Sequence, residues 1–515
     1  MPRFGGRQIK HASNMEHHLR MSNTSDIGKK GITAVKWCTA GAGAKYLLHF
    51  CSQIVLARLL GPENYGLFAI GMIVLTFGQF FASFGFAWGL VQSQRLRQED
   101  IRFVFTAQLI SGALVAAVVY LIAPAVAAYF NEPRVASIVR WLSIACVVHA
   151  LTSPATNLLK RKMDFRTVSI IEISSYGIGY LGVGIPLACW GAGVWSLVAA
   201  WLTQALGALV FSLLRSPYSF KPLFWYDGAP AQLNIGFTVF ATNISNWLLN
   251  NMDRILLGRF ANAHAVGLYV VGYNLATTPA MLIASAQPAF LAAGARIQSE
   301  PERLRRAYLS VIATVWVLVA PLFVVLATVA PELVSLLYGT AWESSGMVLS
   351  IIALSMPAHL TFGVSTPILW NTGCKRYEVV LQLPILLLAA IAFYSLSSQG
   401  IVMVAAVAAA VLVARAAVIT VKACRQLNIR VGDLAPSIMR GSAMIVLAAA
   451  GSLAGAELGR LASPTTAGAF FGGAVAGCSA LVMAALFAPQ LLGASVIEML
   501  GRFNTAIPAA LSRSR

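Results

Sequence analysis

The sequence predicts an all-α polytopic membrane protein of about fourteen transmembrane helices, built from two parallel six-helix repeats and two further C-terminal helices. Of its 515 residues, 58% are hydrophobic and only 11% are charged, and the mean hydropathy is +0.75. Apolar runs follow one another along almost the whole chain. In addition, one segment near the start recurs in the middle of the chain, which indicates an internal repeat.

The apolar runs are long enough to cross a bilayer. A helix needs roughly 20 apolar residues to span a hydrocarbon core of about 30 Å. The run from Phe103 to Phe130, for example, contains no charged residue. The predicted spans begin near Ile32, Tyr65, Phe103, Ala136, Thr167, Ala192, Asn234, Ala265, Ala307, Ser345, Tyr377, Ile401, Leu434 and Ala467.

The formal charge of +19 is distributed by side of the membrane. Lys and Arg gather in the two terminal tails and in alternate loops, whereas the opposite loops carry only Arg58, Arg134, Arg259 and Arg460. Because cytoplasmic loops are rich in Lys and Arg, we expect both termini in the cytoplasm and an even number of spans. This distribution explains the charge without a nucleic-acid partner.

The internal repeat has a fixed offset. "IVLARLLGPENYGLFAIG" (54–71) aligns without a gap to "ILLGRFANAHAVGLYVVG" (255–272), so that Arg58 matches Arg259 and Gly66 matches Gly267. Six predicted spans separate the copies, and an even number gives both copies the same orientation in the membrane. Transporters built from repeats bind their substrates between the two halves near the midplane, so we expect a cleft lined by the first and seventh helices.

The repeat and the charge pattern together predict the domain organisation. We expect a disordered cytoplasmic tail and two six-helix lobes joined by a cytoplasmic linker, followed by two additional spans and a second cytoplasmic tail. The corresponding ranges are 1–31, 32–215, 216–233, 234–423, 424–490 and 491–515.

The predicted seventh helix carries a polar stripe. Asn243, Asn246, Asn250, Asp253 and Arg254 fall within about 100° of arc on a helix. Polar groups at bilayer depth normally face a bundle interior or a wet cavity. Through the repeat, three of these positions correspond to Lys45, His49 and Gln53 on the first helix, next to Ser52.

Two interpretations of the stripes stay open. In the functional one, Lys45, His49 and Arg254 form a cationic wall for an anionic substrate, and Asp253 is a counter-ion or a cation-coupling site. In the other, the polar groups only form hydrogen bonds that fix the packing between the lobes. Asp253 and Arg254 do not pair simply with each other, because neighbouring residues on a helix point about 100° apart.

Other embedded charges have simpler interpretations. Glu172, near the cytoplasmic end of the fifth helix, is a candidate proton carrier, although it can equally snorkel or pair with Lys162 or Arg166. Arg140 and Arg415 lie close enough to helix ends for us to expect snorkelling.

Common catalytic signatures are absent from the sequence. There is no G-x-x-x-x-G-K-[ST] phosphate-binding loop, so we expect no ATP hydrolysis by this chain, and there is no H-E-x-x-H or G-x-S-x-G motif. The seven cysteines are scattered singly, which indicates neither a disulfide framework nor a metal site. We therefore expect a transporter without a cofactor, and a membrane polymerase or ligase is the less favoured alternative.

Several segments resemble one known family. "ARLLGPENYGLFAI", "NNMDRILLGR", "VGLYVVGYNLATTP" and "GAGVWSLVAAWL" are similar to the Wzx-type polysaccharide exporters of the multidrug/oligosaccharidyl-lipid/polysaccharide flippase superfamily, over about residues 30 to 430. Only Asp253, Arg254 and Arg259 match the family's motif residue by residue, and the resemblance implies that their role is partly architectural. Lys45 and His49 are predicted as site residues from the polar stripe alone.

The resemblance implies a function and a shape. It implies a non-enzymatic flippase in the bacterial inner membrane, with a V-shaped pair of lobes around a basic cavity. The flippase moves undecaprenyl-pyrophosphate-linked oligosaccharide between leaflets by alternating access, for exopolysaccharide, capsule or O-antigen synthesis. A polysaccharide polymerase and a chain-length regulator are implied partners, and Asp253 and Glu172 are candidates for proton or sodium coupling. The alternatives are a peptidoglycan-precursor flippase and a multidrug cation antiporter of the same superfamily.

Overall fold

The structure is a computed structural model that describes residues 6–83, 90, 96–226, 229–284, 300–374, 376–463, 465–493 and 496–498. The described residues form helices, most of them connected by short turns, and a longer non-helical segment at 216–226. Eleven helical segments are long and apolar enough to cross a membrane. The prediction of an all-α, multi-pass membrane protein is thereby confirmed, while the count of fourteen spans stays a prediction.

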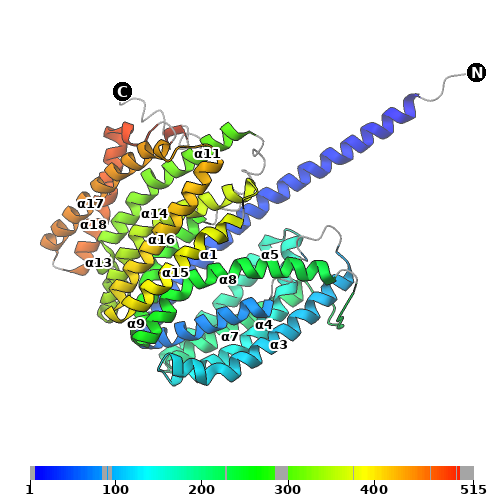
Figure 1. Cartoon of the computed structure of the whole chain (residues 1–515), viewed down its shortest axis with the longest axis horizontal. Helices are drawn as coiled ribbons and strands as arrows, with labels where there is room; N and C mark the ends of the chain where they lie inside the picture. The colour runs from blue at the N-terminus through cyan, green and yellow to red at the C-terminus, as the bar shows by residue number, and fades with distance from the viewer. Residues whose placement is uncertain are drawn as a thin grey trace, which may run out of the picture.

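The first element, α1 (Gly6–Ser83), contains both of the first two predicted spans. It is interrupted at Gly61, whose φ of 72° is accessible to glycine without a side-chain clash, and Pro62 follows it. The initial part of α1 extends away from the other helices (Figure 1). Residues 6–31, which we expected to be a disordered tail, therefore continue the first helix.

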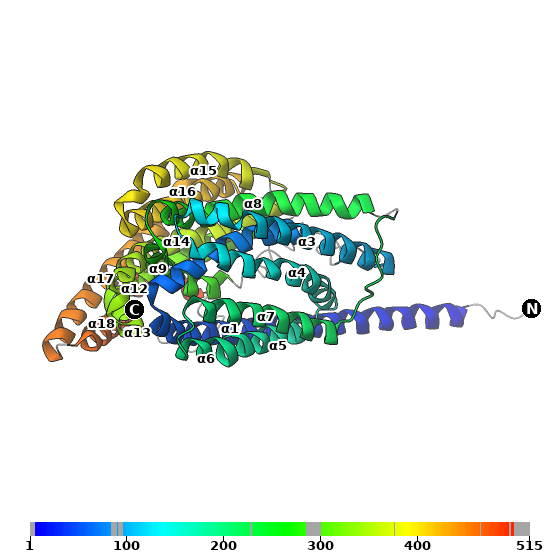
Figure 2. The same cartoon turned by 90° about the horizontal axis from the view of Figure 1, so that it is seen from below.

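The helices from α1 to α7 pack together on one side of the molecule, and we call residues 43–215 the first lobe (Figures 1 and 2). Gly179, in the π-helix η1, approaches Ala200 O so closely that an added Cβ would lie 2.5 Å from it. The elements that follow α1 in this lobe are α3 (Gln98–Tyr129), α4 (Arg134–Arg161), α5 (Phe165–Tyr176), η1 (Gly177–Gly184), α6 (Ile185–Cys189) and α7 (Val194–Arg215).

The helices from α8 to α16 form a second group, and we call residues 229–426 the second lobe. Within it, α14 packs against α9, α12 and α16, and α15 packs against α8 and α16. Its main elements are α8 (Ala229–Phe260), α9 (Ala263–Ala284), α11 (Pro301–Thr314), η2 (Val315–Val319), α12 (Ala320–Thr328), α13 (Ala330–Tyr338), α14 (Glu343–Asn371), α15 (Arg376–Leu396) and α16 (Ile401–Gln426).

The lobes converge where α1 packs against α9 (Figure 1). Gly66 and Gly267, which match in the sequence repeat, lie at this contact, and a Cβ added to either would lie 3.0 Å from the backbone N of the other. A Cβ on Gly66 would overlap the carbonyl of Ala263, and a Cβ on Gly267 would overlap the carbonyl of Pro62. Since Pro62 and Ala263 also match in the repeat, the contact is reciprocal, as in an interface built on a two-fold axis.

Two further helices, α17 (Ala435–Ala462) and α18 (Thr466–Phe487), form a hairpin after the second lobe. Gly455 and Gly459 of α17 face Gly472 and Gly468 of α18 without side chains between them, so the two backbones approach closely. The hairpin packs on α12 and α13 of the second lobe. These helices thus extend the second lobe.

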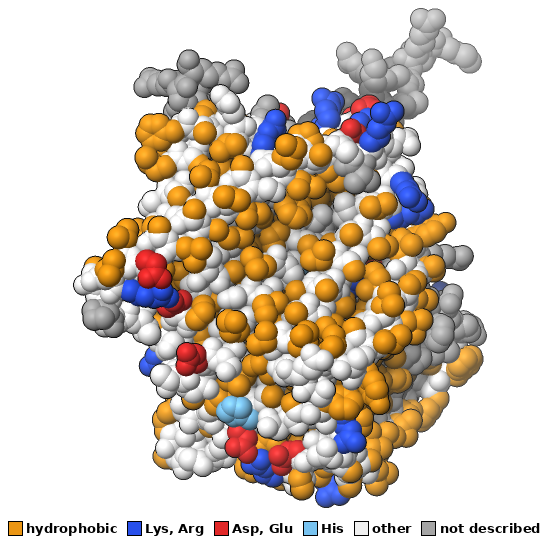
Figure 3. Space-filling view, turned by 60° about the vertical axis from the view of Figure 1, so that its left-hand side comes forward, with side chains coloured by type: hydrophobic (Ala, Val, Ile, Leu, Met, Phe, Trp, Pro, Cys, Tyr) orange, Lys and Arg blue, Asp and Glu red, His pale blue; other side chains and the backbone are white. Residues whose placement is uncertain are grey.

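The outer surface is apolar over most of its height. Figure 3 shows hydrophobic side chains across the middle of one face, with charged side chains gathered toward its margins. Exposure of so many large apolar side chains to water would be unfavourable; Leu121 (73% exposed) and Leu388 (67%) are examples. A surface of this kind is suited to contact with lipid chains.

Candidate functional site

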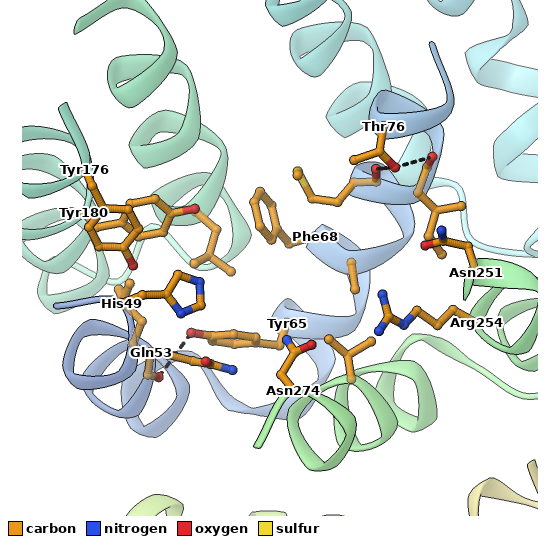
Figure 4. A pocket seen from close by; sticks show the side chains of 16 residues that line it. His49, Gln53, Tyr65, Phe68, Thr76, Tyr176, Tyr180, Asn251, Arg254 and Asn274 are labelled. Carbon is orange, nitrogen blue, oxygen red and sulfur yellow. Dashed lines mark hydrogen bonds between the residues drawn. The ribbon is translucent and has the colours of Figure 1, made fainter. Parts of the chain in front are cut away.

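A cavity of about 250 Å³ lies between the two lobes (Figure 4). It is lined by both halves of α1, by α5, η1 and α7 of the first lobe, and by α8 and α9 of the second lobe. The first and seventh predicted helices therefore both contribute to it. The polar side chains that the chemistry below uses are His49, Gln53, Tyr176, Tyr180, Asn251 and Arg254.

The first-lobe wall of the cavity is polar and aromatic. Tyr176 and Tyr180 stack with ring centroids 4.4 Å apart and planes 10° apart, and His49 lies against Tyr176 with centroids 5.6 Å apart. The Tyr176 hydroxyl is 2.5 Å from Ser52 Oγ, which ties α5 to α1. Of the predicted residues on α1, His49 and Gln53 line the cavity.

The second-lobe wall contains a guanidinium group. Arg254 lies with its Cζ 4.8 Å from the centre of the Tyr273 ring, a cation–π contact that holds its planar head. Its Nε is buried and has no hydrogen-bond partner among the described residues. A buried donor of this kind is unfavourable unless a ligand or water accepts from it, so this atom is the strongest indication of a binding function.

Asp253 is directed away from the cavity. Its side chain is only 4% exposed; Tyr269 OH donates to Oδ2 at 2.6 Å and the backbone N of Arg254 donates to Oδ1 at 2.8 Å. The carboxylate thus fastens α8 to α9, and Arg254 points elsewhere, as expected for neighbours on a helix.

Asn246 and Asn250 do not line the cavity, although the polar stripe placed them there. Arg415 Nη1 donates to Asn250 Oδ1 at 2.9 Å, and Nη2 donates to Asn246 Oδ1 at 3.4 Å. Residues one position apart differ by about 100°, so the same helix presents Asn251 and Arg254 to the cavity and Asn250 to α16. For these two residues the structure favours the packing interpretation. The side chain of Asn243 lies outside the described residues.

The expectation that Arg415 snorkels is wrong. Its side chain is 3% exposed in the interior of the second lobe. Besides the two asparagines, its Nε donates to Gln382 Oε1 of α15 at 2.9 Å, and its Cζ lies 4.8 Å from the Phe362 ring centre of α14. A buried cation with several oxygen partners joins four helices, and sequence position alone does not reveal such partners.

Lys45 and Glu172, two predicted site residues, form an ion pair. Lys45 Nζ lies 2.9 Å from Glu172 Oε2, and the two side chains are 38% and 47% exposed. Glu172 thus pairs with Lys45 on α1, a partner that was not expected, whereas Lys162 lies in the turn before α5 and Arg166 in the first turn of α5. Because both groups are about half exposed, this ion pair stabilises the fold only weakly.

Several lining residues were not predicted as site residues. Tyr65, Tyr180, Asn251 and Asn274 line the cavity beside the predicted ones (Figure 4). Asn251 lies next to the predicted stripe, and Tyr180 is one turn beyond Tyr176. Tyrosines in apolar runs are also typical of helix packing, so the sequence offered little signal for them.

Comparison with known proteins identifies the family of this chain. The family of polysaccharide biosynthesis proteins matches residues 55–346, which is more than half of the chain. The chain belongs to this family. Its relatives include the lipopolysaccharide biosynthesis protein WzxC of Escherichia coli (strain K12), 23% identical over 66% of this chain and 69% of the relative. The succinoglycan biosynthesis transport protein ExoT of Rhizobium meliloti (strain 1021) is 25% identical over 67% and 69%. The resemblance to Wzx-type polysaccharide flippases is confirmed.

Solved structures share the fold of this polysaccharide biosynthesis protein. The lipid II flippase MurJ in an inward closed conformation has a TM-score of 0.67 at 12% identity, covering 88% of this chain and 99% of MurJ. An inward-facing multidrug resistance transporter of the MATE family has a TM-score of 0.57 at 14% identity, covering 75% and 94%. At these identities the two likenesses show a shared fold.

Proposed function

We propose that this chain is a flippase for undecaprenyl-pyrophosphate-linked oligosaccharide repeat units. It moves them from the cytoplasmic to the periplasmic leaflet of the bacterial inner membrane for exopolysaccharide, capsule or O-antigen synthesis. The observation that carries the proposal is Arg254, a cation at the cavity between the lobes whose buried Nε has no described partner. A binding site with this property is suited to an anionic ligand.

The pyrophosphate is the part of the substrate that most needs protein contacts. Moving its negative charges through a medium of low dielectric is strongly unfavourable unless cations or hydrogen-bond donors accompany them. The planar guanidinium of Arg254 is suited to bidentate contact with phosphate oxygens. His49 on the facing wall, and Lys45 nearby on α1, would add donors as the group passes.

The sugars and the lipid chain have different requirements. Sugar hydroxyls need hydrogen-bond partners, which the amides of Gln53, Asn251 and Asn274 and the tyrosine hydroxyls of the cavity supply. The polyprenyl chain can stay among the bilayer lipids. Rocking of the lobes about their α1–α9 contact would then open the cavity to each side in turn, which is alternating access.

Glu172 is the better of the two candidates for proton or sodium coupling. Asp253 is buried and accepts hydrogen bonds from Tyr269 and from the backbone of Arg254. Glu172 is 47% exposed and pairs with Lys45. Protonation of Glu172 would release Lys45 toward an anionic substrate, so that proton binding and substrate binding would be linked.

Peptidoglycan lipid-precursor flipping is the second candidate function, favoured by the fold shared with lipid II flippase MurJ. Such a substrate has the same pyrophosphate chemistry, so the cavity does not distinguish the two. A multidrug cation antiporter is less favoured, because Arg254 would repel a cationic substrate.

Deletion of the gene followed by lipid extraction tests the proposal. We expect undecaprenyl-linked oligosaccharide to accumulate in the cytoplasmic leaflet and surface polysaccharide to be lost, with both restored by the intact gene. Surface polysaccharide made at the parental level without accumulation would refute the function. Rescue of a strain depleted of its lipid II flippase would instead support the second candidate.

A further inference from the structure

We infer that Arg58 and Arg259 form a reciprocal latch that holds the two lobes together at one end of the molecule. We call this end the closed end; it is where α1 bends at Gly61 and where α8 ends at Phe260. The inference rests on the alternating-access cycle proposed above, but not on the identity of the substrate.

Each arginine reaches from its own lobe to the other one. Arg58 of the first lobe donates from Nε to Leu337 O at 2.6 Å and from Nη2 to Leu336 O at 2.5 Å. Both carbonyls belong to the last turn of α13 in the second lobe. In the opposite direction, Arg259 donates from Nη1 to Tyr129 O at 2.9 Å, and this residue ends α3 in the first lobe.

The chemistry of the two contacts is the same. The last carbonyls of a helix have no intrahelical partner and lie at the negative end of its dipole, so a cation can cap them. Neither arginine depends on the identity of a side chain for these hydrogen bonds, since both bond backbone oxygens. Arg259 adds a contact with the Tyr129 ring, whose centre is 5.5 Å from Cζ.

The sequence repeat makes the two contacts equivalent. Arg58 and Arg259 occupy the same position in the two copies of the motif, as do Gly66 and Gly267 at the adjacent backbone contact. The latch is therefore a pair of contacts on either side of the glycine contact, which itself leaves no room for a side chain. Rocking of the lobes that opens the closed end must break both arginine contacts.

The latch gives both arginines a role on a face of the protein that is otherwise poor in basic residues. In the sequence, Arg58 and Arg259 are two of the few cations among the loops opposite the basic ones. As latch residues they act only in the conformation in which the closed end is closed. Their loss should shift the population toward the opposite conformation and leave the lobes themselves folded.

Arg134 is a matched control at the same end. Its guanidinium binds Glu63 at 2.5 Å and Glu132 at 2.8 Å, and all three residues belong to the first lobe. Substitution of Arg134 removes a cation and its hydrogen bonds from the closed end without removing a contact between lobes. A general loosening of this end is thus distinguishable from release of the latch.

Thiol accessibility in the full-length protein tests the latch. The seven native cysteines are replaced, Ala263→Cys is introduced at the buried α1–α9 contact, and the protein is labelled with a polar maleimide in nanodiscs. We expect Arg58→Gln with Arg259→Gln to raise the labelling rate by about fivefold or more, and each single substitution to give an intermediate rate. Arg134→Gln should leave the rate within about twofold of the parent.

An unchanged labelling rate in the double variant, or an equal rise with Arg134→Gln, would overturn the inference. If the double variant does not accumulate, the single variants and Arg58→Lys test the latch instead. Lysine keeps the charge but loses the second donor, so Arg58→Lys should label at a rate between those of the parent and Arg58→Gln. The labelling needs no substrate. If the deletion strain accumulated no lipid-linked oligosaccharide, the proposed function would be refuted, but the labelling result for the latch would be unaffected.

Discussion

Arg415 Nη1 on α16 donates a hydrogen bond of 2.9 Å to Asn250 Oδ1 on α8. The bond lies inside the second lobe and not at the cavity, and Gln382 on α15 accepts from the same guanidinium. The polar stripe of α8 therefore serves two purposes. One edge holds the lobe together, and the other edge faces the cavity with Arg254.

Substitution of Arg415 should weaken the second lobe. Arg415→Ala would leave the amide oxygen of buried Gln382 without this donor, at about 1–3 kcal/mol, and would also remove the hydrogen bonds to Asn246 and Asn250. We expect a lower melting temperature of the purified protein by intrinsic fluorescence. Arg425→Ala, an exposed position on the same helix, should change the melting temperature little. Equal effects of the two would mean that the buried network adds nothing to stability.

Arg254 should be essential for transport and dispensable for folding. Arg254→Ala removes the cation of the cavity, and we expect export of surface polysaccharide to fall about tenfold or more at an unchanged level of membrane protein. Arg254→Lys keeps the charge but loses the planar fork, so it should restore only part of the export. Wild-type export from the alanine variant would refute a role in substrate binding.

Lys45 and Glu172 should differ in their effect on export. Lys45→Ala removes a cation that we propose to contact the substrate, so export should be lost. Glu172→Gln frees Lys45 from its ion pair and should preserve export, while making it less dependent on external pH if Glu172 couples protons. Similar losses from both substitutions, restored by exchange of the two residues, would show that the pair is structural.

The reciprocal glycine contact predicts that Gly66 cannot be replaced by a residue with a side chain without loss of stability. A Cβ on Gly66 would overlap Ala263 O, so Gly66→Ala should separate α1 from α9 and lower the melting temperature by several degrees. Gly43→Ala is the control on the same helix, because nothing lies within 4 Å of its added Cβ. Alanine favours helix over glycine by about 1 kcal/mol, so the control should be neutral or stabilising. A neutral Gly66→Ala would mean that the lobes are not in close contact there.

We expect the contribution of Glu132 to the stability of the fold to depend on pH. Its hydrogen bond from Arg134 lowers the pKa of this carboxyl group, which lies in the loop between α3 and α4. A carboxylate with a lowered pKa stabilises the fold above its unfolded pKa and loses that effect as the pH falls through the folded pKa. The difference in melting temperature between the parent and Glu132→Gln should therefore shrink as the pH falls below about 4.5. A difference independent of pH would exclude this linkage.

Much of the architecture follows from local sequence properties. The apolar runs and the repeated motif are each contained in a short stretch of chain, and eleven segments of the described residues are helices long and apolar enough to cross a membrane. The membrane determines this outcome, since a buried backbone must satisfy its own hydrogen bonds and does so as helix. The family resemblance likewise depended on contiguous motifs.

The chemistry of the cavity was decided by the tertiary structure. Sequence spacing places Asn250 and Arg254 on one broad polar arc, but Asn250 is hydrogen-bonded to Arg415 of α16, 165 residues further along the chain, while Arg254 faces the cavity. In the same way Lys45 finds Glu172, and Asp253 finds Tyr269. The pattern of apolar and polar residues along a helix indicates which polar side chains face away from lipid. It does not indicate their hydrogen-bond partners, because those partners lie on helices far away in sequence and are set by how the helices pack.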